Sequence, residues 1–246
     1  MAIAGLVVAS LLFPLDAEAD SSVAGPCAAV SHEGNAYTVC TIDPERYELR
    51  LFWDDPAGEP YRWFRDLPRI SSGGRIAFAM NAGMYDGDLA PVGLYVANGQ
   101  ERKSLNTNDG PGNFHLLPNG VFFIADGRAG VMETERFARE APAVDLATQS
   151  GPMLVIDGEI HPRFIPGGTS RKRRNGVGVT DDGEVVFAIS DGFVNFWDFG
   201  RLFRDRLGTD NALFLDGSMS SLYAPAMGRE DRRRPMGPII AAYEGG

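Results

Sequence analysis

Three polar residues stand where apolar runs of the sequence end or begin, and their types suit chemistry beside an anion. Asp216 follows the run Ala212 to Leu215, so a buried strand would hold its carboxylate rigidly at the start of a Gly/Ser segment. Arg174 precedes a glycine-rich apolar stretch, where a guanidinium suits forked contact with a phosphate or carboxylate. Asn81 emerges from the end of the apolar run Ile76 to Met80.

Each of these residues also has a purely structural interpretation. Asn81 can serve turn geometry alone, Arg174 can belong to a structural ion pair, and Asp216 precedes a glycine, as in many ordinary turns. The hydrophobic lead-in to Asp216 favours a functional carboxylate there.

Small residues flank these candidates. Gly83 would let the backbone turn or approach a ligand closely. Ser150 and Gly151 belong to a polar stretch that feeds the apolar run Met153 to Val155. They are candidate substrate contacts, although plain loop chemistry before a strand explains them equally well.

The familiar catalytic signatures are missing from this sequence. There is no G-x-S-x-G, S-x-x-K, P-loop or G-x-G-x-x-G pattern. The three histidines, His32, His115 and His161, lie far apart in sequence without the spacing of a zinc site. We therefore expect neither a metal nor a cofactor.

Taken in order, six segments resemble the phosphodiester glycosidase family, the family of the mannose 6-phosphate uncovering enzyme. The resemblance covers roughly Ile76 to Pro225. The matching segments are N-[AG]-G-[MF]-[FY] at Asn81, P-x-G-L at Pro91 to Leu94, Gly112-Asn113-Phe114 with Pro118-Asn119-Gly120 behind it, S-G-P-M-L at Ser150 to Leu154, R-x-G-V-G at Arg174 to Gly178, and L-D-G at Leu215 to Gly217.

The resemblance implies hydrolysis of the bond between a sugar C1 and the phosphate of a glycosyl phosphodiester. Arg174 would contact the phosphate, with Lys172 or His115 beside it. Asp216 would serve as nucleophile, base or stabiliser of an oxocarbenium ion, with Asp191 as a candidate second carboxylate. Asn81 would orient sugar hydroxyls. Asp191 is equally well explained as a turn residue.

One departure from the family pattern bears on function. Better-known members carry Asp-Gly-Gly-Gly-Ser where this chain has Asp216-Gly217-Ser218-Met219-Ser220, which indicates a distinct bacterial branch. The bulkier segment keeps open a non-catalytic role as a periplasmic carbohydrate-binding or polysaccharide assembly factor. A conventional glycosidase acting on exported glycans without phosphate is a third possibility.

The elements that must position these residues are mainly short strands. Asn-Gly and Asp-Gly pairs at Asn98, Asn119, Asp157 and Asp182 predict hairpins. The predicted strands are Tyr47 to Trp53, Arg75 to Met80, Val92 to Ala97, Val121 to Ala125, Met153 to Asp157, Val185 to Ser190 and Ala212 to Leu215. The fold class is therefore α+β, a sheet-dominated single domain with mainly antiparallel strands and a few packed helices.

One helix is clear from its periodicity. Apolar residues recur at helical spacing from Phe196 to Leu207, with Asn195 as N-cap and Gly208 as the left-handed stop. Weaker helical patterns cover Phe64 to Pro68 and Thr134 to Arg139. The tail after Met227, rich in Arg, Pro and Gly, is the one candidate for disorder.

The N-terminal region predicts export. An apolar run from Ala2 to Leu15 precedes Ala17-Glu18-Ala19, so we expect a signal peptide over residues 1–19 and a phosphodiester glycosidase-like domain over residues 20–246. An uncleaved anchor is the alternative. Cys27 and Cys40 would then form a disulfide in a periplasmic or secreted protein.

Charge narrows the choice of partners. The formal net charge of −10 disfavours nucleic-acid binding, because an acidic surface repels phosphate backbones. The basic run Arg171 to Arg174 is a local exception that suits an anion, although a solvated loop explains its first three residues equally well. The expected partner is a phosphate-bearing small molecule or glycan, with no stable membrane insertion once the leader is removed.

Overall fold

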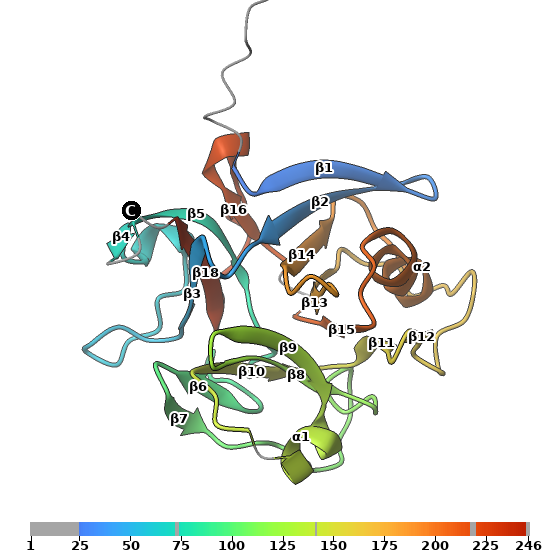
Figure 1. Ribbon diagram of the computed structural model, residues 1–246, viewed down its shortest axis with the longest axis horizontal. Helices are drawn as coiled ribbons and strands as arrows, with labels where there is room; N and C mark the ends of the chain where they lie inside the picture. The colour runs from blue at the N-terminus through green and yellow to red at the C-terminus, as the bar shows by residue number, and fades with distance from the viewer. Residues whose placement is uncertain (1–24, 72–73, 141, 217–219, 245–246) are drawn as a thin grey trace, which may run out of the picture.

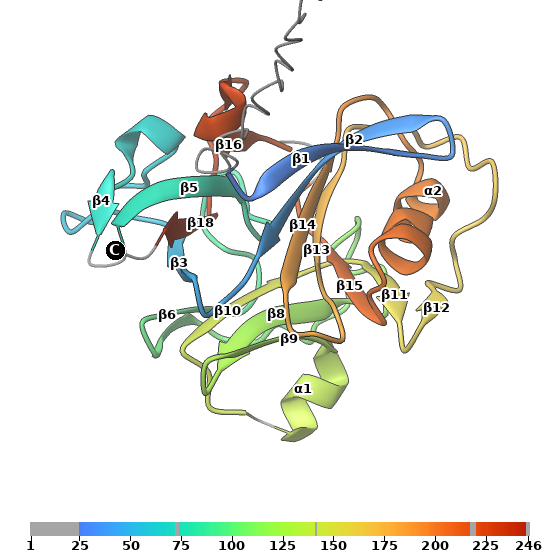
Figure 2. The same cartoon turned by 45° about the horizontal axis from the view of Figure 1, so that its top comes forward.

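Three antiparallel sheets make up the molecule (Figures 1 and 2). The computed structural model describes residues 25–71, 74–140, 142–216 and 220–244. The seven-stranded sheet has the order β1 (Cys27–His32), β2 (Asn35–Ile42), β14 (Val185–Ser190), β13 (Asn175–Val179), β15 (Asn211–Phe214), β11 (Met153–Ile156), β12 (Glu159–Ile160). The five-stranded sheet has the order β7 (Gln100–Lys103), β6 (Tyr95–Ala97), β10 (Leu146–Ser150), β8 (Gly120–Ala125), β9 (Arg128–Glu133). The six-stranded sheet has the order β17 (Arg229–Glu230), β16 (Leu222–Ala224), β5 (Gly74–Asn81), β18 (Ile239–Glu244), β3 (Tyr47–Phe52), with β4 (Ile70–Ser71) also paired to β5.

Short helices cover the outer faces of two sheets. In Figure 1, α1 (Thr134–Glu140) lies beside β8 and β9, and α2 (Phe196–Arg201) lies against the seven-stranded sheet. α2 continues into the π-helical turn η3 (Leu202–Arg206). Two single 3-10 turns complete the helical content of the described residues, η2 (Phe64–Asp66) and η5 (Pro225–Met227).

The core lies where the three sheets meet. Phe78 of β5, Phe122 of β8 and Phe187 of β14 come from different sheets, and each is fully buried. The ring centroids of Phe78 and Phe187 are 4.8 Å apart, and those of Phe122 and Phe187 are 5.9 Å apart. Because Phe187 contacts a ring from each of the other two sheets, these aromatic contacts help to fix the sheets against one another.

The predicted fold class is confirmed. Every strand pairing among the described residues is antiparallel. Six of the seven predicted strands are present to within one or two residues, but the strand predicted from Val92 to Ala97 begins only at Tyr95. Pro91 has no N–H for a ladder, and Gly93 packs directly against the side chain of Gln149, so the chain before Tyr95 is shaped by local contacts instead.

Three of the four predicted hairpins are confirmed. Asn98, Asp157 and Asp182 lie in the turns that join β6 to β7, β11 to β12 and β13 to β14. The prediction for Asn119 was wrong, since this residue is buried and its side-chain Nδ2 donates at 2.8 Å to the carbonyl of Phe114. Here the amide anchors a loop to the start of β8 instead of reversing the chain.

The helix predicted from Phe196 to Leu207 is present, with a change of winding after Arg201. Asn195 caps it as expected, because its Oδ1 accepts a hydrogen bond from Asp198 N at 2.8 Å. Gly208 ends it with φ of +66°. The weaker patterns correspond to η2 and α1.

The prediction of disorder after Met227 was wrong. Residues 239–244 form β18, which pairs with both β5 and β3 in the middle of a sheet, and five of its six side chains are buried. The composition of the Arg-rich segment concealed the apolar run Ile239 to Tyr243, whose pairing partners lie far away in the sequence.

The N-terminal predictions divide into one that is confirmed and one that is untested. Cys27 and Cys40 form a disulfide across the β1–β2 hairpin, where they face each other in register. The expected signal peptide lies outside the described residues. Within the described part of the chain, helices are all too short or too polar to span a bilayer.

Candidate active site

A central strand delivers Asp216 to the end of the seven-stranded sheet. β15 lies between β13 and β11, and its Leu213 and Phe214 are buried. Beyond the strand, Leu215 N donates to Asn175 O at 3.0 Å and Asp216 N approaches Ala82 O at 3.4 Å. These bonds attach the backbone before the carboxylate to two sheets, so Asp216 is held in place and only 8% exposed.

Asn81 supports the backbone on both sides of the segment 217–219. The residue ends β5 and is fully buried. Its Nδ2 donates to Asp216 O at 2.9 Å, and its Oδ1 accepts from Ser221 N at 2.9 Å. Asn175 extends this network, because its Nδ2 donates to Asn81 O at 3.1 Å and its Oδ1 accepts from Ser220 Oγ at 3.2 Å. All the hydrogen-bonding atoms of the Asn81 amide thus face protein backbone.

Arg174 is a buried cation that the described part of the chain holds without a carboxylate. The residue is 1% exposed, and its Nε and Nη2 donate to the carbonyls of Val194 at 3.0 Å and Ser170 at 2.8 Å. Its guanidinium carbon lies 3.5 Å from the ring centroid of Phe196. Within the described residues, Nη1 makes no hydrogen bond and no acidic side chain forms an ion pair with the guanidinium. Burial lowers the pKa of Arg174 to about 10, so the group is still cationic at neutral pH.

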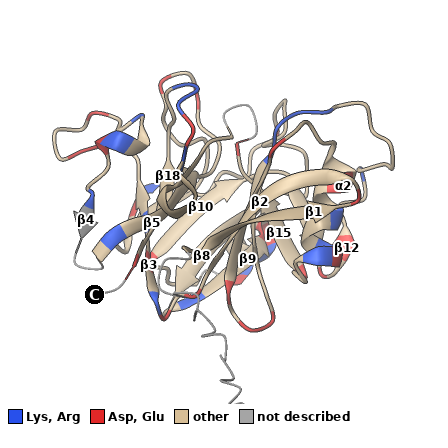
Figure 3. Ribbon diagram, turned by 90° about the horizontal axis from the view of Figure 1, so that it is seen from above, with Lys and Arg blue, Asp and Glu red and all other residues tan. Residues whose placement is uncertain are grey.

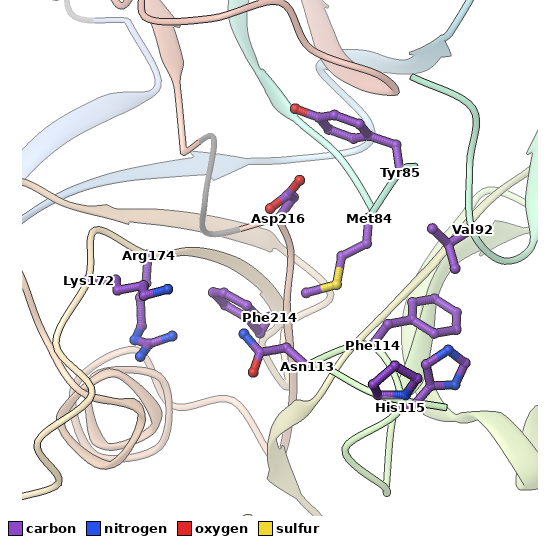
Figure 4. Close-up of a pocket in the computed structure, with 11 residues that line it drawn as sticks. Met84, Tyr85, Val92, Asn113, Phe114, His115, Lys172, Arg174, Phe214 and Asp216 are labelled. Atoms are coloured by element: carbon purple, nitrogen blue, oxygen red, sulfur yellow. The ribbon is translucent and has the colours of Figure 1, made fainter. Parts of the chain in front are cut away.

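Asp216 and Arg174 line the same pocket, which has a volume of about 340 Å³ (Figure 4). Figure 4 shows Arg174 and Lys172 on one side, His115 and Phe114 on the other, and the Asp216 carboxylate between them and Tyr85. The full lining is Met84, Tyr85, Val92, Pro111, Asn113, Phe114, His115, Lys172, Arg174, Phe214 and Asp216. The pocket thus combines a carboxylate, two cations and several apolar surfaces.

His115 presents one ring nitrogen to the protein. Its Nδ1 lies 2.8 Å from Asn108 O, and since a carbonyl can only accept, Nδ1 carries the proton. In the neutral imidazole, Nε2 is therefore an acceptor. The ring also makes an edge contact with Phe114 at 5.0 Å between centroids.

Tyr85 is a pocket residue that the sequence analysis did not single out. Figure 4 shows its ring on the Asp216 side of the pocket, and its hydroxyl donates to Pro235 O at 3.5 Å. Burial, and secondly the charge of Asp216, raise the pKa of Tyr85 well above its usual value, so the phenol remains a protonated donor. A side chain at position 237 would collide with the ring of Tyr85, so Gly237 makes room for it. The N-A-G-M-Y stretch was a signal for this residue, although only its first position received a role.

Asp191 lies outside this pocket. Its Oδ1 is 2.7 Å from Nη1 of Arg229, and Thr38 Oγ1 donates to the same carboxylate at 3.3 Å. The backbone carbonyl of Asp191 accepts from Arg173 Nη2 at 2.8 Å. The structure thus brings Asp216, Arg174 and His115 together but places Asp191 in a neighbouring ion pair.

The remaining predicted contacts belong to the scaffold behind the pocket. Gly83 N donates to Thr148 Oγ1 at 3.2 Å, and a Cβ at position 83 would collide with the backbone of β10. Ser150 is fully buried at the end of β10. A Cβ at Gly151 would lie 2.7 Å from the carbonyl oxygen of Phe114, so this glycine allows the pocket loop to pack closely.

Among the described residues, no group of three or more His, Cys, Asp or Glu side chains is placed to hold a metal ion.

Comparison with known proteins adds a family and a fold. A family model described as phosphodiester glycosidase matches residues 74–242. The chain is 35% identical over 244 residues to the uncharacterized protein YigE of Escherichia coli strain K12, covering 98% of this chain and 93% of that protein.

Two solved structures share the fold. One is the catalytic domain of zebrafish N-acetylglucosamine-1-phosphodiester alpha-N-acetylglucosaminidase, auto-inhibited by its pro-peptide, with a TM-score of 0.63 at 13% identity over 92% of this chain and 85% of that one. The other is a hypothetical protein from Synechocystis, with a TM-score of 0.51 at 15% identity over 89% of this chain and 61% of that one.

Proposed function

This chain belongs to the phosphodiester glycosidase family, and on that premise we propose that it is a hydrolase that cleaves the bond between a sugar C1 and the phosphate of a glycosyl phosphodiester. The pocket lined by Asp216 and Arg174 is the proposed active site. The substrate is a small molecule or glycan that carries this linkage.

The observation that carries the proposal is the presence in one pocket of a carboxylate and a buried guanidinium that has no ion-pair partner among the described residues. Taking a charge out of water is costly unless an opposite charge or good hydrogen bonds compensate. The carbonyls and aromatic rings around Arg174 compensate only partly, as its lowered pKa indicates. A phosphate would supply the missing negative charge and accept from Nη1.

The reaction follows from the charges that the pocket offers. When the bond between C1 and the bridging oxygen breaks, its electron pair stays on that oxygen and a phosphomonoester leaves. This leaving group carries negative charge without first being protonated, so anion contacts from Arg174 and Lys172 assist departure more than a strong general acid would. Tyr85 adds a neutral hydroxyl donor on the Asp216 side of the pocket.

Asp216 acts on the sugar side of the broken bond. Positive charge develops at C1 as the phosphate departs, and the carboxylate of Asp216 stabilises this charge without bonding to C1. Water then adds its oxygen to C1 and gives up a proton to a base, for which Asp216 is the one carboxylate in the described lining of the pocket. Asn81 acts through Asp216 by fixing its backbone, instead of contacting sugar hydroxyls as the sequence suggested.

The same chain carries a feature of exported proteins. The disulfide between Cys27 and Cys40 persists only in an oxidising compartment, which supports a periplasmic or secreted location.

The proposal is tested by incubating the purified protein with a glycosyl phosphodiester and following free sugar and phosphomonoester together. Asp191→Asn is the matched control for Asp216→Asn, because Asp191 is a carboxylate outside the pocket. Release of both products by wild type and by the Asp191 variant, but not by the Asp216 variant, is the expected result. Saturable binding without release would instead support the carbohydrate-binding role.

A further inference from the structure

The charges of this acidic protein are unevenly distributed along β13. The basic run Arg171 to Arg174 immediately precedes the strand, at the pocket end of the seven-stranded sheet. Asp181, Asp182 and Glu184 follow it at the opposite end, where Asp43 and Glu45 lie beside them. From residue 160 to residue 180 the chain has five basic and no acidic residues, although the whole protein has a net charge of −10.

A second basic segment joins the pocket end from another sheet. Arg229 forms ion pairs with Asp191 at 2.7 Å and with Asp231 at 3.1 Å, and these pairs bring the segment that follows β17 next to the end of β14. This segment continues with Arg232, Arg233 and Arg234, all three of which are exposed, and Arg232 forms an ion pair with Glu230 at 2.8 Å. Figure 3, which draws Lys and Arg in blue, shows two stretches of these basic residues on loops at the upper edge of the molecule.

Two large apolar side chains project from the loops at this same end. Phe193 and Ile165 are 67% and 66% exposed, the two highest values for large hydrophobic side chains in the described part of the chain. Phe193 follows β14, and its carbonyl accepts from Arg171 Nη2 at 2.7 Å. The turn that starts at Ile165 packs beside Asn195, so the two apolar residues stand on neighbouring loops.

We infer that the pocket end of the molecule docks on an anionic phospholipid bilayer and, given the proposed function, that the aglycone of the substrate is a lipid. Exposed arginines would attract the negative surface, and each basic residue near such a surface strengthens binding about fivefold. Phe193 and Ile165 would enter the interfacial region, where apolar side chains are stabilised. The docked molecule holds its pocket against the plane in which lipid phosphates lie.

The apolar pair is the reason to choose a bilayer over a soluble polyanion. A nucleic acid or an acidic polysaccharide would engage the arginines but would leave Phe193 and Ile165 in water. The acidic opposite end, with five carboxylates around one cleft, would be repelled by the same surface and so would orient the molecule.

Vesicle sedimentation tests the docking without any substrate. Wild-type protein should bind vesicles of phosphatidylglycerol and phosphatidylcholine mixed equally, and should bind pure phosphatidylcholine at least tenfold more weakly. The double variant Phe193→Ser with Ile165→Ser, and the charge reversal Arg233→Glu, should each weaken binding to the anionic vesicles at least fivefold. Met227→Ser and Arg139→Glu are the matched controls, since Met227 is another exposed apolar residue and Arg139 lies on α1.

Two outcomes would overturn the inference. Equal binding to both kinds of vesicle would show that the anionic surface is not recognised. Full competition by dextran sulfate, together with vesicle binding that the apolar double variant does not change, would show a simple polyanion site. Lipid specificity is tested with matched substrates that carry a methyl or a long-chain aglycone, and the double variant should lose activity only on the long-chain substrate in vesicles. If the double variant lost activity on both substrates, the assignment of a lipid aglycone would be wrong. If wild type hydrolysed neither substrate, the proposed function would be disproved, and the binding to anionic vesicles would stand on its own.

Discussion

The side-chain amide of Asn81 holds the backbone of Asp216, with a 2.9 Å hydrogen bond between residues that are 135 positions apart. The other end of the amide accepts from Ser221 N, so one side chain supports both flanks of the segment 217–219. The end of a strand in one sheet thereby positions the carboxylate at the end of a strand in another. A polar residue that resembled a substrate contact in the sequence is, in the structure, a support for the carboxylate that we propose to be catalytic.

Asn81→Ala should lower both stability and turnover. The substitution leaves the carbonyl of Asp216 and the N–H of Ser221 without their buried partner, which costs about 1–3 kcal/mol of unfolding free energy for each group left unsatisfied. We expect kcat to fall more than KM rises, since Asp216 is displaced while the anion contacts remain. Denaturant unfolding and steady-state kinetics measure the two effects. A large rise in KM at unchanged stability would instead indicate that Asn81 contacts the sugar directly.

Arg174→Lys should chiefly weaken substrate binding. Lysine keeps a charge but loses the planar group that stacks on Phe196 and reaches the carbonyl of Val194. Losing one charge-assisted hydrogen bond of about 1.5–3 kcal/mol corresponds to a rise in KM of roughly ten- to a hundredfold. Arg173→Lys is the matched control, because Arg173 is the adjacent arginine and does not line the pocket. Equal kinetics for the Arg174 variant and wild type would refute the phosphate contact.

The sequence predicted those parts of the molecule that depend on local patterns. Asn195 as a cap, Gly208 as a stop and the turns at Asn98 and Asp157 follow from the conformational preferences of residues close in sequence. The site candidates Asp216 and Arg174 were found because each stands at the end of a buried run. Ordered motifs also identified the family, whose model matches residues 74–242.

The parts that escaped prediction depend on long-range contacts. β18 lies at the end of the chain, yet it pairs with β5 and β3, and no local pattern shows which partners a strand will find. The different roles of Asn81 and Asp191 follow from the partners that the fold brings to them, Asp216 and Arg229. Tyr85 escaped notice because its position beside Asp216 requires the close approach of Gly237 from the C-terminal segment.

His161 should make the protein less stable in mild acid. Burial foremost lowers the pKa of this histidine below its usual value, so the folded state binds a proton less readily than the unfolded state. The unfolded chain therefore takes up more protons as the pH falls below about 6.5, and folding stability declines in that direction. His161→Phe keeps an aromatic ring against Phe164 and should flatten this part of the curve of unfolding free energy against pH. If the unfolding free energy of His161→Phe depended on pH as steeply as that of wild type, His161 would not be the cause of the lower stability in acid.

The disulfide should contribute stability without contributing to catalysis. Closing a loop between residues 13 positions apart is worth about 3 kcal/mol of unfolding free energy, because the bridge restricts the unfolded chain. The double variant Cys27→Ser with Cys40→Ser should lose about this amount and keep its kcat, since none of the pocket-lining residues lies on β1 or β2. Chemical denaturation with and without a reducing agent provides the measurement. Only wild type should respond to the reductant, and a response from the double variant would contradict this explanation.

We propose that the pocket around Asp216 and Arg174 hydrolyses a glycosyl phosphodiester. This is tested by following the phosphorus-31 and anomeric proton resonances of such a substrate during incubation with wild type and with Asp216→Asn, a nearly isosteric change. Wild type should form a phosphomonoester and free sugar in equal amounts, and the variant should bind substrate but turn over at least about a thousandfold more slowly. Undiminished hydrolysis by a folded Asp216→Asn protein would contradict this proposal.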